Sequence, residues 1–356
     1  MKIDFLINSL GGGGAERVMT TLANGFSKKH AIRLITFNKG KDFNLDKEIK
    51  SIDLHEGKIK NHTVRSILNL YNYYKYKNNR PDILISFLPP NNLIAIIIAR
   101  FLGIKVIISE HTNHTAKFGK KTELIQKLSY RFSNALTVLT TFDKVHFERL
   151  GANVCVMPNP LNLPTEIEPL YKREKTILIV GALNRYESKG FDSLIKIIAP
   201  ILKKNKSWKL IIAGGGDQGL FILKNLTAEL DIQSQVIFKG FCKNINELMQ
   251  TSQIFVLPSK FEGLPMGLME ALSNGMACIA YNCPSGPEDL IDNNINGLLI
   301  KDQDTILMSE GISKLINEKE LRNKLADNAP NSMIDYSLEN ILDRWDALIK
   351  SVIKND

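Results

Sequence analysis

The chain has 356 residues, 44% of them hydrophobic and 23% charged, and a formal net charge of +9. This length suits two domains, and the composition excludes a disordered, collagen-like or fibrous protein. The longest apolar stretch, residues 93–102, is interrupted by Arg100. It is about half as long as the ~20 residues of a membrane-spanning helix, and residues 1–7 resemble a first strand rather than an apolar leader.

Positive charge is concentrated in the first half of the chain. Residues 1–165 hold 24 Lys and Arg against 12 Asp and Glu, a net charge of +12, whereas residues 166–356 hold 22 against 25, a net charge of −3. This asymmetry suggests that the two halves have different partners. An anionic membrane surface, an anionic acceptor or nucleic acid would each fit the basic half.

The four cysteines predict no metal site. They form no C-x-x-C pair and lack His partners at metal-ligand spacing: Cys155, Cys242, Cys278 and Cys283. We therefore expect reduced thiols in a cytoplasmic protein and no structural zinc.

The first half alternates strand-like and helix-like segments. Strands are expected at residues 3–8, 32–37, 83–87, 106–109 and 135–139, and helices at 15–27, 64–78 and 93–103. This alternation predicts a parallel, doubly wound sheet. Residues 157–164, with three prolines, are then expected to form a linker.

A second series of the same kind follows. Strands are expected at residues 176–180, 209–213, 236–239, 254–257 and 277–281, and helices at 191–204, 218–230, 245–250 and 265–274. The tail, residues 338–353, has one apolar helical face. We predict α/β domains over residues 1–164 and 165–335, and a final helix over 336–356 that packs across their junction and returns to the first domain. The expected site is the cleft between the domains, at the carboxyl ends of the strands.

The most specific motif is residues 259–272, SKFEGLPMGLMEAL. A glycine turn after a buried strand leads to Pro265, where a helix is expected to begin, and the free N–H groups of such a helix end favour phosphate. Glu262 on the turn and Glu270 in the helix can accept hydrogen bonds from sugar or ribose hydroxyls. Two solvated glutamates are the alternative.

This motif resembles the E-x7-E signature of the retaining GT-B glycosyltransferases of family 4, F/Y-E-G-x6-E-A. The residues that match it are Phe261, Glu262, Gly263, Glu270 and Ala271. Residues 286–291 resemble the next family element, G-x-x-E-x-I, one residue short, and residues 296–299 resemble the N-G-L-L turn after it. The resemblance covers essentially the whole chain and is strongest over residues 177–299. It implies a GT-B fold, with an acceptor domain first and a nucleotide-sugar domain second.

Further donor residues follow from this resemblance. In the family, an Arg and a Lys after the first strand of the second domain stabilise the leaving diphosphate, and here we assign Arg185 and Lys189. The family's Arg directly follows the glycine, a position held here by Ala182, so Lys189 is the firmer assignment. The remaining donor positions are glycine-turn and helix-start residues: Gly13, Gly14, Gly214, Gly240, Phe241, Gly263, Leu264, Pro265 and Met266. Ordinary solvated side chains and simple glycine turns are the alternatives.

The amino-terminal glycines do not form a dinucleotide fingerprint. In either frame of G-x-G-x-x-G, Glu16 or Arg17 takes the place of the last glycine, and no acidic residue ends the second strand. The family uses a similar G-G-A-E-R loop near the donor phosphates and the acceptor. The family also commonly places a His after a strand in contact with the transferred sugar, which corresponds to His111; a structural histidine is the alternative.

Residues 115–132 combine basic and apolar residues at helical spacing. The basic members are Lys117, Lys120, Lys121, Lys127 and Arg131. Such a surface could lie on anionic lipid, at ~1 kcal/mol per basic residue, or be an ordinary solvated face.

The resemblance thus implies a retaining transferase that moves a hexose or N-acetylhexosamine from a nucleotide sugar, UDP-linked by expectation, to a lipid-linked glycan at the inner membrane face. No metal or other cofactor is expected, because Arg185, Lys189 and the helix end supply the positive charge. Two alternatives remain: a GT-B epimerase or inverting transferase, and a non-enzymatic nucleotide-binding module. Nucleic-acid motifs and interleaved aromatic residues are missing, which disfavours a nucleic-acid partner.

Overall fold

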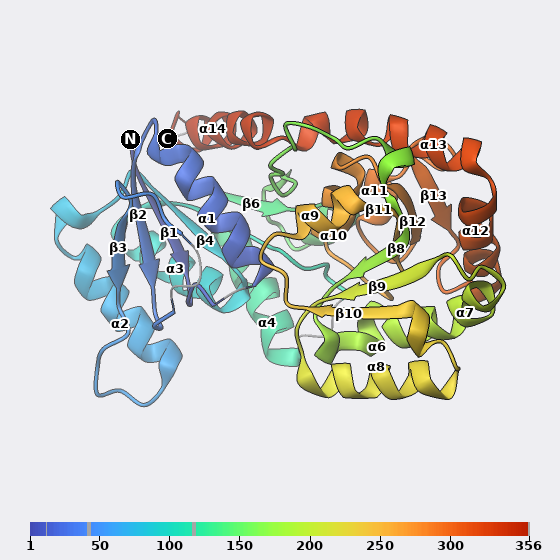
Figure 1. Ribbon diagram of the computed structural model, residues 1–356. Helices are drawn as coiled ribbons and strands as arrows, with labels where there is room; N and C mark the ends of the chain where they lie inside the picture. The colour runs from blue at the N-terminus through green and yellow to red at the C-terminus, as the bar shows by residue number, and fades with distance from the viewer. Residues whose placement is uncertain (12, 41–43, 116–118, 355–356) are drawn as a thin grey trace. The chain divides into compact units, whose positions relative to one another are not determined.

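The computed structural model describes residues 1–11, 13–40, 44–115 and 119–354 (Figure 1). The chain forms two compact units. Unit 1 comprises Met1–Pro160 and Leu338–Asp356, and unit 2 comprises Leu161–Ser337. Each unit is built around its own parallel sheet with helices on both faces, so the predicted pair of doubly wound α/β folds is confirmed.

The sheet of unit 1 has seven strands in the order β3-β2-β1-β4-β5-β6-β7, all of them parallel. The strand order reverses between β1 and β4, and ligands of such sheets bind beyond the carboxyl ends of the strands near the reversal. The strands are β1 (Lys2–Ile7), β2 (Ala31–Thr36), β3 (Lys50–Asp53), β4 (Ile83–Phe87), β5 (Lys105–Ser109), β6 (Ala135–Val138) and β7 (Val154–Val156).

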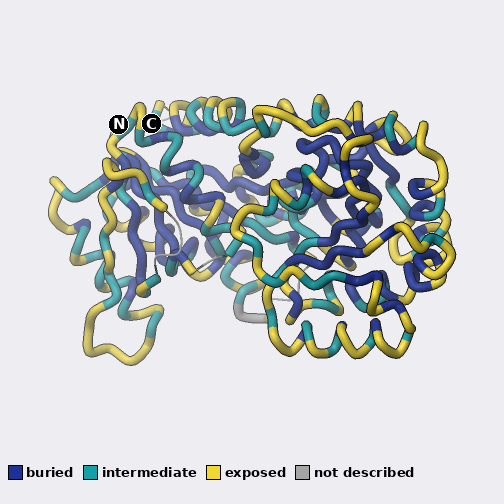
Figure 2. Tube along the Cα trace, viewed as in Figure 1, coloured by how far each residue is buried: buried dark blue, intermediate teal, exposed yellow. Residues whose placement is uncertain are grey.

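Helices cover both faces of this sheet, and the strands between them are mainly buried, as Figure 2 shows in dark blue. The helices α1 and α14 pack on one face, around Phe5 and Leu34. On the other face, α2, α3 and the turn η2 pack around Leu84 and Val106. The helices of unit 1 are α1 (Gly14–Ser27), α2 (His62–Tyr74), η1 (Lys77–Asn79), α3 (Pro89–Leu102), α4 (Lys120–Ser129), η2 (Tyr130–Phe132), α5 (Thr141–Arg149) and α14 (Leu338–Lys354).

The final helix is part of the core of unit 1. Its apolar face, read from the sequence, is the face that is buried, through Ile341, Trp345, Ile349 and Val352. These side chains belong to the same cluster as Phe5 and Phe26. In Figure 1, the red α14 runs beside the blue α1. The last residues of the chain therefore complete the fold of its first residues.

Unit 2 has a six-stranded parallel sheet in the order β10-β9-β8-β11-β12-β13, with the reversal between β8 and β11. The strands are β8 (Glu174–Val180), β9 (Lys209–Ala213), β10 (Val236–Gly240), β11 (Ser252–Leu257), β12 (Ala277–Tyr281) and β13 (Gly297–Ile300). The helices are η3 (Leu170–Lys172), η4 (Leu183–Arg185), α6 (Tyr186–Lys189), α7 (Phe191–Lys204), α8 (Asp217–Glu229), η5 (Gln233–Gln235), α9 (Ile245–Thr251), α10 (Met266–Ser273), α11 (Pro287–Leu290), α12 (Thr305–Asn317), α13 (Lys319–Asn328) and η6 (Pro330–Tyr336).

The strands that the sequence did not predict, β3, β7 and β13, all lie at sheet edges. They are only three or four residues long, β3 is mostly exposed, and the apolar runs of β7 and β13 are too short to indicate strands. The sequence predicts a turn at residues 296–299, but β13 already begins at Gly297. Helix α3 begins at Pro89 rather than near Leu93, because proline fits the first turn of a helix, where no N–H donor is needed.

We predict that Trp345→Ala lowers the free energy of unfolding by ~3–5 kcal/mol, because it removes a large buried side chain from the core of unit 1. Urea denaturation followed by circular dichroism measures the change. Asp343→Ala, at an exposed position of the same helix, is the matched control and should be near neutral. Equal stability of the two variants would contradict the packing of α14 described above.

Candidate functional site

The carboxyl edge of the unit 2 sheet brings a lysine and a glutamate into contact at the strand reversal. Lys189 ends α6, beyond β8, and Glu262 lies in the loop that follows β11. The Nζ atom of Lys189 donates to both carboxylate oxygens of Glu262, at 2.7 and 2.9 Å. The side chain of Glu262 is only 9% exposed, so the interpretation as a solvated loop glutamate is wrong.

Ser259 also holds this carboxylate, and the sequence analysis did not single it out. Its hydroxyl donates to Oε1 of Glu262 at 2.6 Å. Serine three residues before a loop glutamate is too common a pattern to indicate this contact. Together, Lys189 and Ser259 fix the carboxylate with three hydrogen bonds.

A glycine keeps the two loops close together. Gly190 has a φ of +70°, and a Cβ atom there would lie 2.0 Å from the carbonyl oxygen of Pro258. The N–H group of Lys260 donates to the carbonyl oxygen of Ser188 at 3.0 Å. Glycine is therefore required directly after Lys189, both for its backbone conformation and for the approach of the neighbouring loop.

The glycine turns after β8, β9 and β10 are joined by backbone hydrogen bonds. The N–H of Gly214 donates to the carbonyl oxygen of Gly240 at 2.8 Å, and that of Leu183 donates to Gly215 at the same distance. A Cβ atom on Gly214 would lie 1.8 Å from the carbonyl oxygen of Gly181. The backbones of these turns therefore pack closely against one another, and Phe241 is exposed beside them.

Helix α10 begins beside this layer without a side-chain cap. Its N-cap residue is Pro265, so the N–H groups of the first helical turn, beginning with Met266, receive no side-chain acceptor. Leu264 is buried, and the hydroxyl of Ser285 donates to the carbonyl oxygen of Gly263 at 2.8 Å. Glu270 lies more than one turn into the helix and is also buried, so it is not a surface glutamate.

Arg185 is placed differently from Lys189. It ends the turn η4, and its side chain is exposed. Within the part of the chain that the structure describes, its guanidinium makes no hydrogen bond or ion pair. The departure from the family spacing thus coincides with an arginine that does not join the Lys189–Glu262 pair in this structure.

In unit 1, the loop after β1 leads into α1 through Gly13 and Gly14. Glu16 folds back over this loop, and a Cβ atom on Gly13 would lie 2.2 Å from its carboxylate. The N–H of Arg17 donates to the carbonyl oxygen of Gly13 at 3.1 Å, and the side chain of Arg17 is exposed. Gly12 lies outside the described residues.

His111 follows β5 at the carboxyl edge of the unit 1 sheet, as predicted. Its ring stacks on Phe87 with the centroids 4.6 Å apart, and its Nε2 atom lies 3.1 Å from the hydroxyl of Ser109. Burial lowers the pKa of His111 to about 3, although a hydrogen bond with Asn159 opposes the shift. The imidazole is therefore neutral at physiological pH and can hydrogen-bond but not carry charge.

Glu110, beside it, is a buried carboxyl that the sequence analysis did not identify. Tyr130 donates to its Oε1 atom, and Asn92 donates to the same oxygen at 3.2 Å. Burial raises the pKa of Glu110 to about 7, while hydrogen bonds from Tyr130, Gln126 and Asn92 act in the opposite direction. This edge of unit 1 therefore holds a neutral imidazole next to a carboxyl that is half protonated near neutral pH.

The basic segment of residues 115–132 forms α4 and η2 in the described part. Lys117 lies outside the described residues, and the backbone of Lys120 and Lys121 begins α4. Lys127 and Arg131 are exposed, and the guanidinium of Arg131 lies 5.2 Å from the ring centroid of Phe132. Exposed apolar residues share this segment: Leu124, Leu128 and Phe132.

One D-x-D triplet, a pattern that would indicate a metal site, follows β13 as Asp302-Gln303-Asp304. Its side chains have structural partners. Asp304 caps α12 by accepting from the N–H of Leu307 at 3.0 Å, and Asp302 accepts from Gln303 at 2.9 Å. In the described ranges, no group of three or more His, Cys, Asp or Glu residues could hold a metal ion.

Residues 165–332 match the family described as Glycosyl transferases group 1, and residues 12–164 match Glycosyltransferase Family 4. An enzyme of Campylobacter jejuni, GalNAc-alpha-(1->4)-GalNAc-alpha-(1->3)-diNAcBac-PP-undecaprenol alpha-1,4-N-acetyl-D-galactosaminyltransferase, is 31% identical over 363 residues, covering 99% of both chains. The chain belongs to glycosyltransferase family 4. It is a glycosyltransferase, and the interpretation as a non-enzymatic nucleotide-binding module is wrong.

Solved structures agree in fold. The lipopolysaccharide outer core galactosyltransferase WaaB in its apo form is 23% identical, with a TM-score of 0.79 and 99% of both chains covered. HepE of Anabaena in complex with UDP is 16% identical, with a TM-score of 0.80 over 99% of this chain and all of its own. These similarities show the GT-B fold of this family 4 enzyme.

We predict that Glu110→Gln changes the pH dependence of stability. Relative to the wild type, the variant should be more stable at pH 8 than it is at pH 5. Because the pKa of Glu110 is raised to about 7, the native state keeps a proton that the unfolded chain releases between about pH 4.5 and 7. The free energy of unfolding of the wild type therefore falls as the pH rises through this window, and Gln removes that loss. The variant should gain ~1–3 kcal/mol on the wild type between pH 5 and 8 in urea titrations. A pH-independent difference would contradict this account.

Proposed function

We propose that this glycosyltransferase moves a hexose or N-acetylhexosamine from a UDP-sugar, with retention of configuration, to a hydroxyl of a lipid-linked glycan. The Lys189–Glu262 contact beside the uncapped helix α10 is the observation on which the proposal depends. Comparisons support the choice of substrates. The Campylobacter jejuni relative is named for N-acetylgalactosamine transfer to an undecaprenol-linked glycan, and the HepE structure contains UDP.

In this proposal, Lys189 binds the donor diphosphate. An ammonium group has three N–H donors, and two of them bond Glu262 in this structure. One donor remains for a phosphate oxygen, so Lys189 can bind the leaving group while Glu262 still fixes its position. The first turn of α10 presents the N–H groups of Met266 and Gly267 to the same anion, and Arg185 adds charge from η4.

Hydroxyl recognition is assigned to the two glutamates. Glu262 accepts from hydroxyls of the transferred sugar, and Glu270 accepts from the ribose hydroxyls. The turns that contain Gly214, Gly240 and Gly263 bring the backbone close to the nucleotide. His111, neutral at physiological pH, supplies a hydrogen bond to the sugar without adding charge.

The proposed reaction needs no protein base and no metal ion. The bond between the anomeric carbon and the diphosphate oxygen breaks, and the acceptor hydroxyl forms its new bond on the same face. Its proton passes to an oxygen of the departing diphosphate. Lys189, Arg185 and the α10 terminus stabilise the negative charge that develops there. An inverting reaction would need a general base positioned behind the sugar.

We further propose that the enzyme acts at the inner face of the cytoplasmic membrane in bacterial surface polysaccharide or glycoprotein glycan assembly. No helix in the described part is long and apolar enough to span a bilayer. The +12 charge of residues 1–165 and the exposed Lys127 and Arg131 support a peripheral contact with anionic lipid. The acceptor of the Campylobacter jejuni relative is likewise linked to undecaprenol.

We predict that Lys189→Ala combined with Arg185→Ala lowers kcat by ~10²–10³, the usual cost of removing preorganised charge from a transition state. Initial rates of sugar transfer measure the effect. Lys196→Ala, at an exposed position on α7 in the same unit, is the control and should retain full turnover. Near-normal turnover of the double variant would refute the assigned role of these two cations.

We predict that UDP-sugars raise the melting temperature of the enzyme, because ligands that bind only the native state stabilise it by about 2.7 kcal/mol at 100 times Kd. A thermal-shift panel should include UDP-N-acetylgalactosamine, UDP-N-acetylglucosamine, UDP-glucose, UDP-galactose and GDP-mannose. Glu270→Gln should reduce the shift for UDP itself as well as for its sugars, since it weakens ribose binding. Absence of a shift with every nucleotide sugar would overturn the donor assignment.

A further inference from the structure

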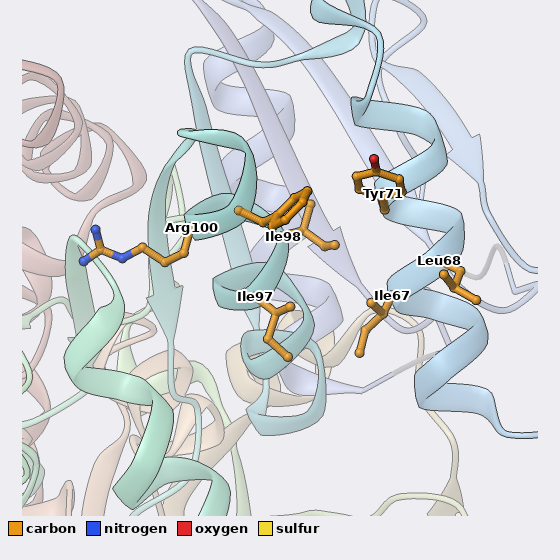
Figure 3. Close-up of a pocket in the computed structure, with 7 residues that line it drawn as sticks. Ile67, Leu68, Tyr71, Ile97, Ile98 and Arg100 are labelled. Atoms are coloured by element: carbon orange, nitrogen blue, oxygen red, sulfur yellow. The ribbon is translucent and has the colours of Figure 1, made fainter.

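An apolar groove lies on the outer surface of unit 1, between α2 and α3 (Figure 3). It has a volume of about 580 Å³. Ile67 and Tyr71 on α2 point toward Ile97 and Ile98 on α3, and Leu68 lines the groove from the outer side of α2. Phe101 and Arg100 complete the lining at the carboxyl end of α3. The donor-site residues assigned above contribute nothing to this groove.

The groove presents large apolar side chains to solvent. Phe101 is 72% exposed, and Leu68 and Ile97 are each 40% exposed. The rings of Tyr71 and Phe101 meet edge to face, with centroids 5.7 Å apart, which bridges the two helices. A cluster of this kind marks an interaction site, because single exposed apolar residues are normal and contiguous ones are not.

The apolar surface continues toward α4. The Nε atom of Arg100 donates to the carbonyl oxygen of Phe132 at 2.6 Å and thereby ties α3 to η2. Leu124, Leu128 and Phe132 are all about half exposed. The groove therefore borders the basic segment that contains Lys127 and Arg131.

Positive charges predominate in the segments that form the groove, and Asp82 is the one acidic residue of residues 57–109. Residues 57–81, which include α2, carry six Lys or Arg and no Asp or Glu. Residues 83–109, which include α3, carry Arg100 and Lys105 and again no acidic residue. Lys75 lies one helical turn after Tyr71, on the same side of α2. Apolar side chains set among predominantly positive charges are complementary to a surface with anionic headgroups above hydrocarbon chains.

We propose that the α2–α3 groove is a lipid-docking site, in which Phe101 and Leu68 enter the acyl region of an anionic bilayer while the surrounding lysines and arginines bind headgroups. The choice of a membrane as the partner rests on the proposed function, because a lipid-linked acceptor resides in a membrane. The location of the docking site does not depend on that function. It assigns the docking site to α2 and α3, with α4 as a flanking basic contact.

Vesicle flotation tests this site, and it needs neither donor nor acceptor. We expect the enzyme to float with vesicles of phosphatidylglycerol and phosphatidylethanolamine, less so in high salt, and not with phosphatidylcholine alone. Phe101→Ser combined with Leu68→Ser should weaken partitioning about tenfold or more, because less apolar surface enters the bilayer. Lys75→Glu should weaken it by a smaller factor.

Matched controls come from α8 of unit 2. Phe221 is nearly as exposed as Phe101, at 67% against 72%, and Lys224 is an exposed lysine on the same helix. Phe221→Ser and Lys224→Glu should bind vesicles like the wild type. Circular dichroism spectra and melting temperatures of all variants should match, since each changed side chain is solvent-facing.

Three results would overturn the proposal. If the Phe101→Ser/Leu68→Ser variant bound vesicles as strongly as the wild type, the groove would be excluded as the lipid-docking site. If Phe221→Ser and Lys224→Glu lost as much vesicle binding as the groove variants, the loss would not be specific to the groove. Failure of the wild type to bind vesicles, together with a dimer by light scattering that the groove variant abolishes, would assign the groove to a second copy. UDP-induced thermal stabilisation, measured on the same samples, reports donor binding separately, so failure of the proposed function is distinguishable from failure of lipid docking.

Discussion

The geometry of parallel strands underlies the whole candidate site, because every strand of a sheet delivers its following loop to one edge. In unit 2, this constraint places the loop after β8 against the loop after β11, at the reversal of strand order. Lys189 and Glu262, 73 residues apart, meet there in a bidentate contact. Gly190 makes the contact possible, since any larger residue would collide with Pro258.

The Lys189–Glu262 pair fixes the position of the positive charge of Lys189. A lysine with no partner so close to a sheet edge would be a mobile cation, whereas this ammonium is held by a carboxylate that Ser259 also fixes. Such preorganisation costs little at the moment of reaction, because the positive charge is already oriented. At the carboxyl edge of the unit 1 sheet, burial instead lowers the pKa of His111 and keeps its imidazole neutral. The two units thus present different electrostatic environments at their sheet edges.

Much of this architecture was predictable from the sequence. Long apolar strands and amphipathic helices have strong periodic patterns, and the glycine turn before Pro265 identified a turn followed by a helix. Short edge strands such as β3 were not predictable, because three or four partly exposed residues carry no such pattern. The contact of Ser259 with Glu262 and the protonation of Glu110 depend on side chains brought together by folding, so no local pattern indicates them. The groove between α2 and α3 likewise arises from two helices whose separate sequences show only apolar faces.

A crystal structure of the enzyme in complex with UDP tests the central claim most directly, because it locates the diphosphate independently of any rate. The account predicts an oxygen of the β-phosphate within ~3 Å of Nζ of Lys189, the ribose hydroxyls on Glu270 and the phosphates at the first turn of α10. A nucleotide bound elsewhere, with no phosphate oxygen in contact with Lys189, would contradict it.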